Sequence, residues 1–150
     1  MEIADFLTWL ILIGTVTVIG IGTMFYAYRG EGSLSVLFDE PLSLPASLPD
    51  SDSGTEACVQ FQEGYNAYKG GQYRQAIDYF TQAIYYESSL AQAYHNRGLA
   101  YANLRQDDDS VINLLSASEL YSQQDNKEAL LLIKQHLQAI KARKLERENL

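Results

Sequence analysis

The stretch Gly64-Tyr-Asn-Ala-Tyr-Lys-Gly-Gly-Gln-Tyr-Arg-Gln-Ala76 decides the fold, because its landmarks recur 34 residues further along the chain. Each landmark is a small or apolar residue, and its counterpart is of similar size or character. The pairs are Gly64 with Gly98, Ala76 with Ser110, Phe80 with Leu114, and Ala83 with Ala117. A fixed period of about 20 to 50 residues predicts an array of stacked supersecondary units.

Helical spacing and turn residues predict five helices after residue 53. Ser53 and Glu56 have the spacing of a capping box, as do Asp125 and Glu128, and Gly70-Gly71 should end the first helix. The expected helices cover about 54–69, 73–86, 90–104, 108–121 and a last one from 125 to beyond 144. We expect the last helix to turn its cations outward, namely Lys134, Lys141, Arg143 and Lys144.

Together with Ala93-Tyr-His-Asn-Arg-Gly-Leu-Ala-Tyr101, the repeated motif resembles the tetratricopeptide (TPR) family. The resemblance implies two helix-turn-helix repeats over 54–122 and a capping helix over 123–150. We expect Gly64 to face Ala76 and Gly98 to face Ser110 where the paired helices cross. The repeat positions that should set the packing are Gly64, Ala76, Phe80, Ala83, Gly98, Tyr101, Ser110, Leu114 and Ala117. Repeat two departs from the family pattern at Arg105 and Asp107, which replace a turn glycine and an aromatic residue.

Residues 6–28 form an uncharged run of 23 residues between Asp5 and Arg29. A helix of that length would measure roughly 34 Å, enough to cross the ~30 Å hydrocarbon core of a bilayer. A signal peptide fits less well, because no basic residue precedes the run and the run is too long. The sequence therefore predicts an all-α, single-pass membrane protein with an anchor over 1–29 that contacts lipid through 6–28.

The only basic residue near the run is Arg29, so the positive-inside bias places the C-terminal domain in the cytoplasm. The opposite topology would make the protein an anchored periplasmic TPR adaptor, an alternative that stays open. Residues 30–53 hold all three prolines among serine and acidic residues, and they predict a flexible linker. Within it, Val36-Leu37-Phe38 is either a contact for a membrane or a partner, or an incidental apolar cluster.

The distribution of charge argues against nucleic acid as a partner. Residues 30–126 hold 4 basic and 14 acidic residues, a net charge of −10, whereas residues 127–150 hold 6 and 3, a net charge of +3. Phosphate recognition requires a basic surface, which an acidic body does not offer. The basic tail fits an exposed helix face, with an acidic partner or anionic lipid as the alternative.

Residues suited to catalysis or to metal binding are scarce. Cys58 is the only cysteine, and His95 and His136 are 41 residues apart without a ligand pattern around them. Asp107-Asp108-Asp109 lacks the alternating ligands of a calcium loop and is expected to cap the fourth helix. No phosphate loop, nucleophile elbow or zinc motif occurs. We therefore expect no enzymatic activity, no catalytic residue, no metal, no cofactor and no small-molecule substrate.

In the TPR family the concave wall binds partner segments, and its residues come from the first helix of each repeat. The positions that this resemblance assigns to partner binding are Phe61, Tyr65, Tyr68, Lys69, His95, Asn96, Leu99 and Asn103. Packing between helices is the alternative role for each aromatic ring. Chaperone-binding TPRs clamp a terminal carboxylate with lysine and asparagine. Asn96 matches that clamp, whereas Phe61 and Tyr65 replace its other residues, so a chaperone co-factor is not expected.

A single span followed by a short TPR array is similar to the photosystem I assembly TPR proteins of cyanobacteria and plastids. That resemblance implies a scaffold at the thylakoid membrane, with a stromal C-terminal domain that assists the assembly or stability of a membrane complex. Its partners would be protein subunits of that complex. A permanent small subunit held by its transmembrane helix is the alternative.

Overall fold

The computed structural model describes residues 12–18, 20, 21, 23, 36–44 and 51–149. The chain forms two compact units, Met1–Ser35 and Val36–Leu150. Every regular element in the described residues is an α-helix, and none of these residues forms a strand. The expected all-α class is confirmed to that extent.

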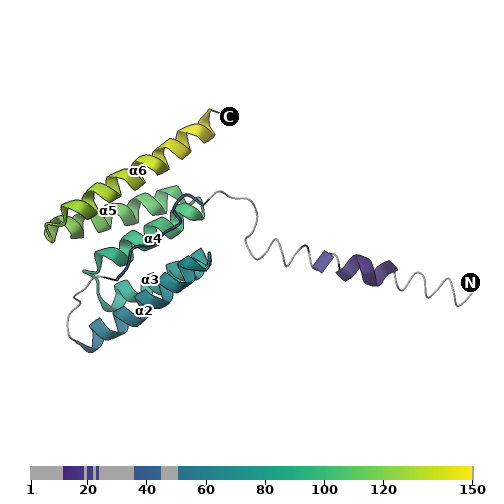
Figure 1. Cartoon of the computed structure of the whole chain (residues 1–150), viewed down its shortest axis with the longest axis horizontal. Helices are drawn as coiled ribbons and strands as arrows, with labels where there is room; N and C mark the ends of the chain where they lie inside the picture. The colour runs from purple at the N-terminus through teal and green to yellow at the C-terminus, as the bar shows by residue number, and fades with distance from the viewer. Residues whose placement is uncertain (1–11, 19, 22, 24–35, 45–50, 150) are drawn as a thin grey trace, which may run out of the picture. The chain divides into compact units, whose positions relative to one another are not determined.

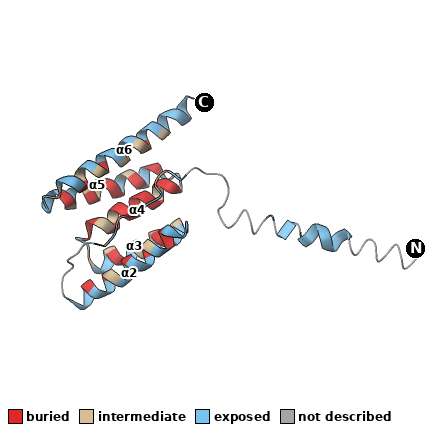
Figure 2. Cartoon of the chain, in the orientation of Figure 1, coloured by how far each residue is buried: buried red, intermediate tan, exposed pale blue. Residues whose placement is uncertain are grey.

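The second unit contains five helices whose bounds agree with the expected ranges to about two residues. They are α2 (Asp52–Lys69), α3 (Tyr73–Tyr86), α4 (Ala91–Asn103), α5 (Asp107–Gln123) and α6 (Lys127–Glu148). Each helix packs mainly on its neighbours in sequence, so the helices form an open stack (Figure 1). The buried residues lie on the facing sides of these helices (Figure 2).

Both expected capping boxes are wrong in position. The hydroxyl of Ser51 accepts a hydrogen bond from the Gly54 N–H at 3.1 Å and caps α2. The side chain of Asn126 accepts from the Ala129 N–H at 3.1 Å and caps α6. In each case the true cap stands three residues before the amide that it satisfies, which is the normal geometry of an N-cap.

The repeated glycines allow the helices to cross closely, though not always against the expected residue. A Cβ at Gly64 would lie 2.8 Å from the Phe80 ring, so Phe80 rather than Ala76 is its closest neighbour. A Cβ at Gly98 would lie 3.2 Å from the Ser110 carbonyl oxygen, which confirms the expected crossing there, and 3.1 Å from Leu114. These distances leave almost no room for a side chain at either position.

Helix α6 covers one end of the stack and is held there by an ion pair that we did not expect. Ala129, Ile133 and Ile140 are buried against the rest of the stack. The Arg143 guanidinium forms an ion pair with the buried Asp107 carboxylate. The expectations that Arg143 points to solvent and that Asp107 serves only as a cap are therefore wrong, because each charge needs the other once both are buried.

The predicted transmembrane anchor and single-pass localisation are contradicted. Of residues 6–28, the structure describes 12–18, 20, 21 and 23 as helical, and the others lie outside the described residues. Among all described helices, none combines the length and the apolar character needed to cross a bilayer.

Residues 36–44 belong to the second unit although they fall within the predicted linker 30–53. They have no regular secondary structure, and they pack against the helical stack. Pro41 is buried, and four neighbouring apolar side chains contact the core: Leu37, Phe38, Leu42 and Leu44. We call residues 36–44 the bound segment.

Candidate protein-interaction site

The bound segment lies on a face formed by α2, α4 and α6, and it runs along α4 in Figure 1. We call this surface the docking face. Its contact residues, which come from three different helices, are Tyr68, Lys69, Asn96, Asn103 and His136. Because the helices that carry them are stacked, these side chains have fixed spacings.

Asn96 binds the main chain of the bound segment through both ends of its amide. Its Oδ1 accepts from the Leu42 N–H at 2.7 Å, and its Nδ2 donates to the Leu42 carbonyl at 2.8 Å. Asn96 is itself fully buried. Such a pair of hydrogen bonds binds the peptide backbone without requiring a particular side chain.

Asn103, two helical turns further along α4, repeats this arrangement. Its Oδ1 accepts from the amides of Leu37 and Phe38 at 3.1 and 3.0 Å, and its Nδ2 donates to the Phe38 carbonyl at 2.8 Å. The Tyr68 hydroxyl also donates to the Phe38 carbonyl, at 2.7 Å, and accepts from Asn103 Nδ2 at 2.9 Å. Burial raises the pKa of the Tyr68 phenol well above its usual value, so the phenol remains a donor.

Two side chains of the bound segment, Phe38 and Glu40, add contacts of their own. The Phe38 ring packs on the His136 imidazole with 4.5 Å between ring centroids. The Lys69 ammonium donates hydrogen bonds to both carboxylate oxygens of Glu40, each at 2.7 Å. Hydrogen bonding to Glu40 raises the pKa of Lys69. The pair is largely exposed, so it contributes more to orientation than to stability.

A pair of histidines, the buried His95 and the half-buried His136, lies beneath the Phe38 ring. His95 Nε2 and His136 Nδ1 are 2.8 Å apart, and the His95 ring also packs on Tyr121 at 5.9 Å between centroids. Burial, with a further contribution from His136, lowers the pKa of His95 to about 3. Burial lowers the pKa of His136 as well. Both rings are therefore neutral at pH 7, and one donates a hydrogen bond to the other.

The residues assigned to partner binding by the TPR resemblance fall into two groups. Tyr68, Lys69, Asn96 and Asn103 contact the bound segment directly. The others lie beneath or beside them: His95 supports His136, Phe61 and Leu99 are fully buried in the core, and Tyr65 is half-buried against it. Phe61 packs edge-on against Phe80 at 5.4 Å, which leaves it no surface for a partner.

Sequence reasoning missed the occupant of the face and the part played by His136. The apolar cluster Val36-Leu37-Phe38 was the one available signal, because it interrupts an otherwise polar linker. Its contact is with the chain's own helices. His136 gave no signal, since its distance of 41 residues from His95 resembles no ligand motif and only the stacking of α6 brings the two rings together.

The docking face contacts the bound segment through polar side chains and the His136 ring. It presents amide, hydroxyl and ammonium groups to a peptide backbone and to one carboxylate. No group of three or more His, Cys, Asp or Glu side chains within the described ranges is arranged to hold a metal ion. Comparison with protein-family models, with curated proteins and with solved structures finds no match to this chain.

Proposed function

We propose that this protein is a non-catalytic interaction scaffold whose docking face binds an extended segment of a partner protein. The observation that carries the proposal is the pair of buried amides, Asn96 and Asn103, bound to the main chain of residues 36–44. On this proposal, residues 36–44 occupy the docking face in place of the partner segment. The resemblance of residues 64–117 to TPR repeats supports the same class of activity.

The contacts of the bound segment describe the partner that the site would accept. Its main chain makes three hydrogen bonds with Asn103, two with Asn96 and one with Tyr68. Hydrogen bonds of this kind each add about 0.5–1.5 kcal/mol net. An aromatic residue over His136, an acidic residue beside Lys69 and a buried proline supply the selectivity. The expected partner segment is therefore extended, with the order aromatic, acidic, proline, leucine.

Tethering makes the internal occupant a competitor. A segment joined to its site by a short linker has an effective concentration of roughly millimolar order. To displace residues 36–44 from the docking face, a partner segment must make more contacts or be present at a higher local concentration. The scaffold would then bind a partner of high affinity and exclude partners of low affinity. This property suits a factor that assists the assembly or stability of a multiprotein complex.

A permanent subunit of such a complex is the second candidate function. Stoichiometric recovery with the mature complex would favour the subunit, whereas enrichment with incomplete complexes would favour the assembly factor. Nothing supports photosystem I as that complex. The resemblance of this chain to photosystem I assembly proteins depended on a transmembrane span, which the structure contradicts.

The experiment that tests the proposal is affinity purification of the full-length chain with quantitative identification of its partners. Asn96→Ala combined with Asn103→Ala removes both amide contacts, so partner recovery should fall several-fold. Gln82→Ala, which removes an exposed amide on α3, serves as the matched control. Full recovery with the Asn96→Ala, Asn103→Ala double variant would place recognition elsewhere on the molecule and contradict the proposal.

A further inference from the structure

Helix α6 is an end helix of the stack, as α2 is, and among the described helices it packs mainly on α5. Helix α3 packs on both α2 and α4, and α5 packs on both α4 and α6.

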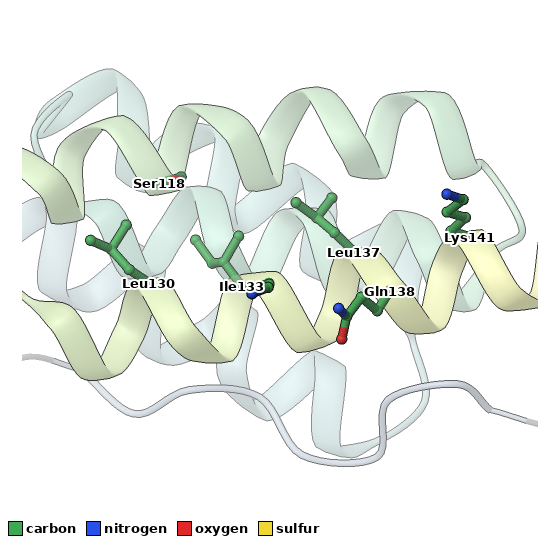
Figure 3. A pocket seen from close by; sticks show the side chains of 7 residues that line it. Ser118, Leu130, Ile133, Leu137, Gln138 and Lys141 are labelled. Carbon is green, nitrogen blue, oxygen red and sulfur yellow. The ribbon is translucent and has the colours of Figure 1, made fainter.

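A shallow apolar hollow lies at this end of the stack, between α5 and α6 (Figure 3). Its volume is about 270 Å³, and its lining includes Ser118 of α5 and Leu130, Ile133 and Leu137 of α6. Leu131 and Leu145, on an adjoining stripe of α6, are 58% and 48% exposed. Exposed leucines beside an apolar hollow form a surface that a helix with an apolar face can cover.

The charges around the hollow indicate the sign of its occupant. Lys127, Arg143, Lys144 and Arg147 of α6 each pair with a carboxylate. Lys134 and Lys141 line the hollow and pair with no carboxylate of the described residues. They are seven residues apart, which places them on one side of α6 about 10 Å apart along its axis.

We propose that this hollow docks an acidic amphipathic helix of a partner protein. Leucine-sized residues at helical spacing would fill the hollow, and carboxylates two turns apart would reach Lys134 and Lys141. A second copy of α6 is a poorer occupant, because it would bring these lysines close to their own counterparts. The proposal concerns a surface apart from the docking face and does not depend on its function.

Two synthetic helical peptides of about five turns test the proposal on the full-length protein. Both carry the same leucine stripe, and one has glutamates beside it where the other has lysines. Fluorescence anisotropy should show the glutamate peptide binding at least about tenfold tighter than the lysine peptide. Lys134→Glu with Lys141→Glu should invert this preference. Both substitutions are at exposed positions, so the fold should persist.

Matched controls separate this site from the docking face. Arg74→Glu, an exposed charge reversal on α3, and Asn96→Ala should leave glutamate-peptide binding within about twofold. Equal binding of both peptides to the parent chain would overturn the proposal, as would a preference that survives the double charge reversal. Self-association of the parent chain in sedimentation, abolished by the double reversal, would also overturn it by making a second copy the occupant.

Discussion

Gly64 and Gly98 show how single residues set the spacing of this stack. The sequence period indicated that both positions must be small. In the structure, a Cβ at Gly64 would lie 2.8 Å from Phe80, and a Cβ at Gly98 would lie 3.1 Å from Leu114. The exact neighbour at Gly64 could not be predicted from the period, because Ala76 and Phe80 lie one helical turn apart on the same side of α3. Side-chain rotation, which the sequence does not reveal, brings the Phe80 ring against Gly64.

Gly64→Ala should lower the free energy of unfolding by about 1–3 kcal/mol, because its Cβ would lie 2.8 Å from a buried ring. The matched control is Glu63→Ala at the neighbouring exposed position, which should change stability by less than about 0.5 kcal/mol. Urea denaturation followed by circular dichroism measures both. Equal midpoints for the two variants would show that the α2–α3 crossing can relax at no cost.

The histidine pair predicts a dependence of stability on pH. The folded-state pKa of His95, about 3, lies below its unfolded value of about 6.5. Between these values the unfolded chain binds a proton that the folded chain excludes. His95 therefore contributes stability that is complete above about pH 6.5 and declines as the pH falls toward 3, with a slope of up to about 1.4 kcal/mol per pH unit.

Denaturation of His95→Gln and the parent chain at pH 7.5 and 5 measures this effect. The parent should lose more stability than the variant over that interval, whatever the absolute stability of the variant. Carboxylates contribute to the loss in both proteins and cancel in the comparison. An identical loss in the two proteins would show that His95 gains its proton in the folded state as readily as in the unfolded chain.

At the scale of elements, helices were predictable where turn residues and apolar spacing agree, and contacts between distant elements were not. Gly71 adopts a φ of 71°, as the turn after α2 requires. Arg105 takes a φ of 61° at the equivalent turn, so the stack imposes a left-handed residue there despite the cost to a side chain. The period predicted the turn at both places, but the strain at the second became visible only in the structure.

The attachment of α6 leads to a prediction at this scale. Asp107 is 7% exposed, and it pairs with Arg143 and, at 3.5 Å, with Arg147. Asp107→Asn would leave the Arg143 charge without a full counterion in a largely buried position. We expect a loss of stability on the order of 2 kcal/mol in urea denaturation.

Asp108→Asn is the matched control for the attachment of α6. The Asp108 side chain is 93% exposed and lies 3.6 Å from Lys144, so its removal should cost well under about 1 kcal/mol. Similar losses in the two variants would mean that the buried ion pair adds nothing beyond a surface pair. In that case the apolar residues of α6 alone would hold it on the stack.

At the scale of the whole molecule, the sequence predicted a face for binding, and the structure places a segment of the same chain on it. Asn96, Asn103, Tyr68 and Lys69 were identified through the TPR resemblance, and each contacts residues 36–44. The occupant could not be predicted, because composition alone assigned 36–44 to a linker. Pairing across 54 to 66 residues depends on a face that exists only after the helices stack.

The proposed competition between the bound segment and a partner has consequences that a purely structural segment would lack. Phe38 and Leu42 are half-buried. Truncating either side chain to alanine should weaken the binding of residues 36–44 to the docking face by about 1–2 kcal/mol. The docking face would then become accessible to a second segment without any change to its own residues. A structural segment would instead be needed for the fold, and its loss would lower stability without creating a binding site.

The most direct test is the equilibrium binding of a labelled peptide with the sequence of residues 36–44 to the full-length chain, measured by fluorescence anisotropy. The Phe38→Ala, Leu42→Ala double variant should bind the peptide at least about tenfold tighter than the parent chain. Adding Asn96→Ala and Asn103→Ala should abolish that binding. Equal affinity of the double variant and the parent, or binding that survives the loss of both amides, would contradict a docking face that exchanges its occupant.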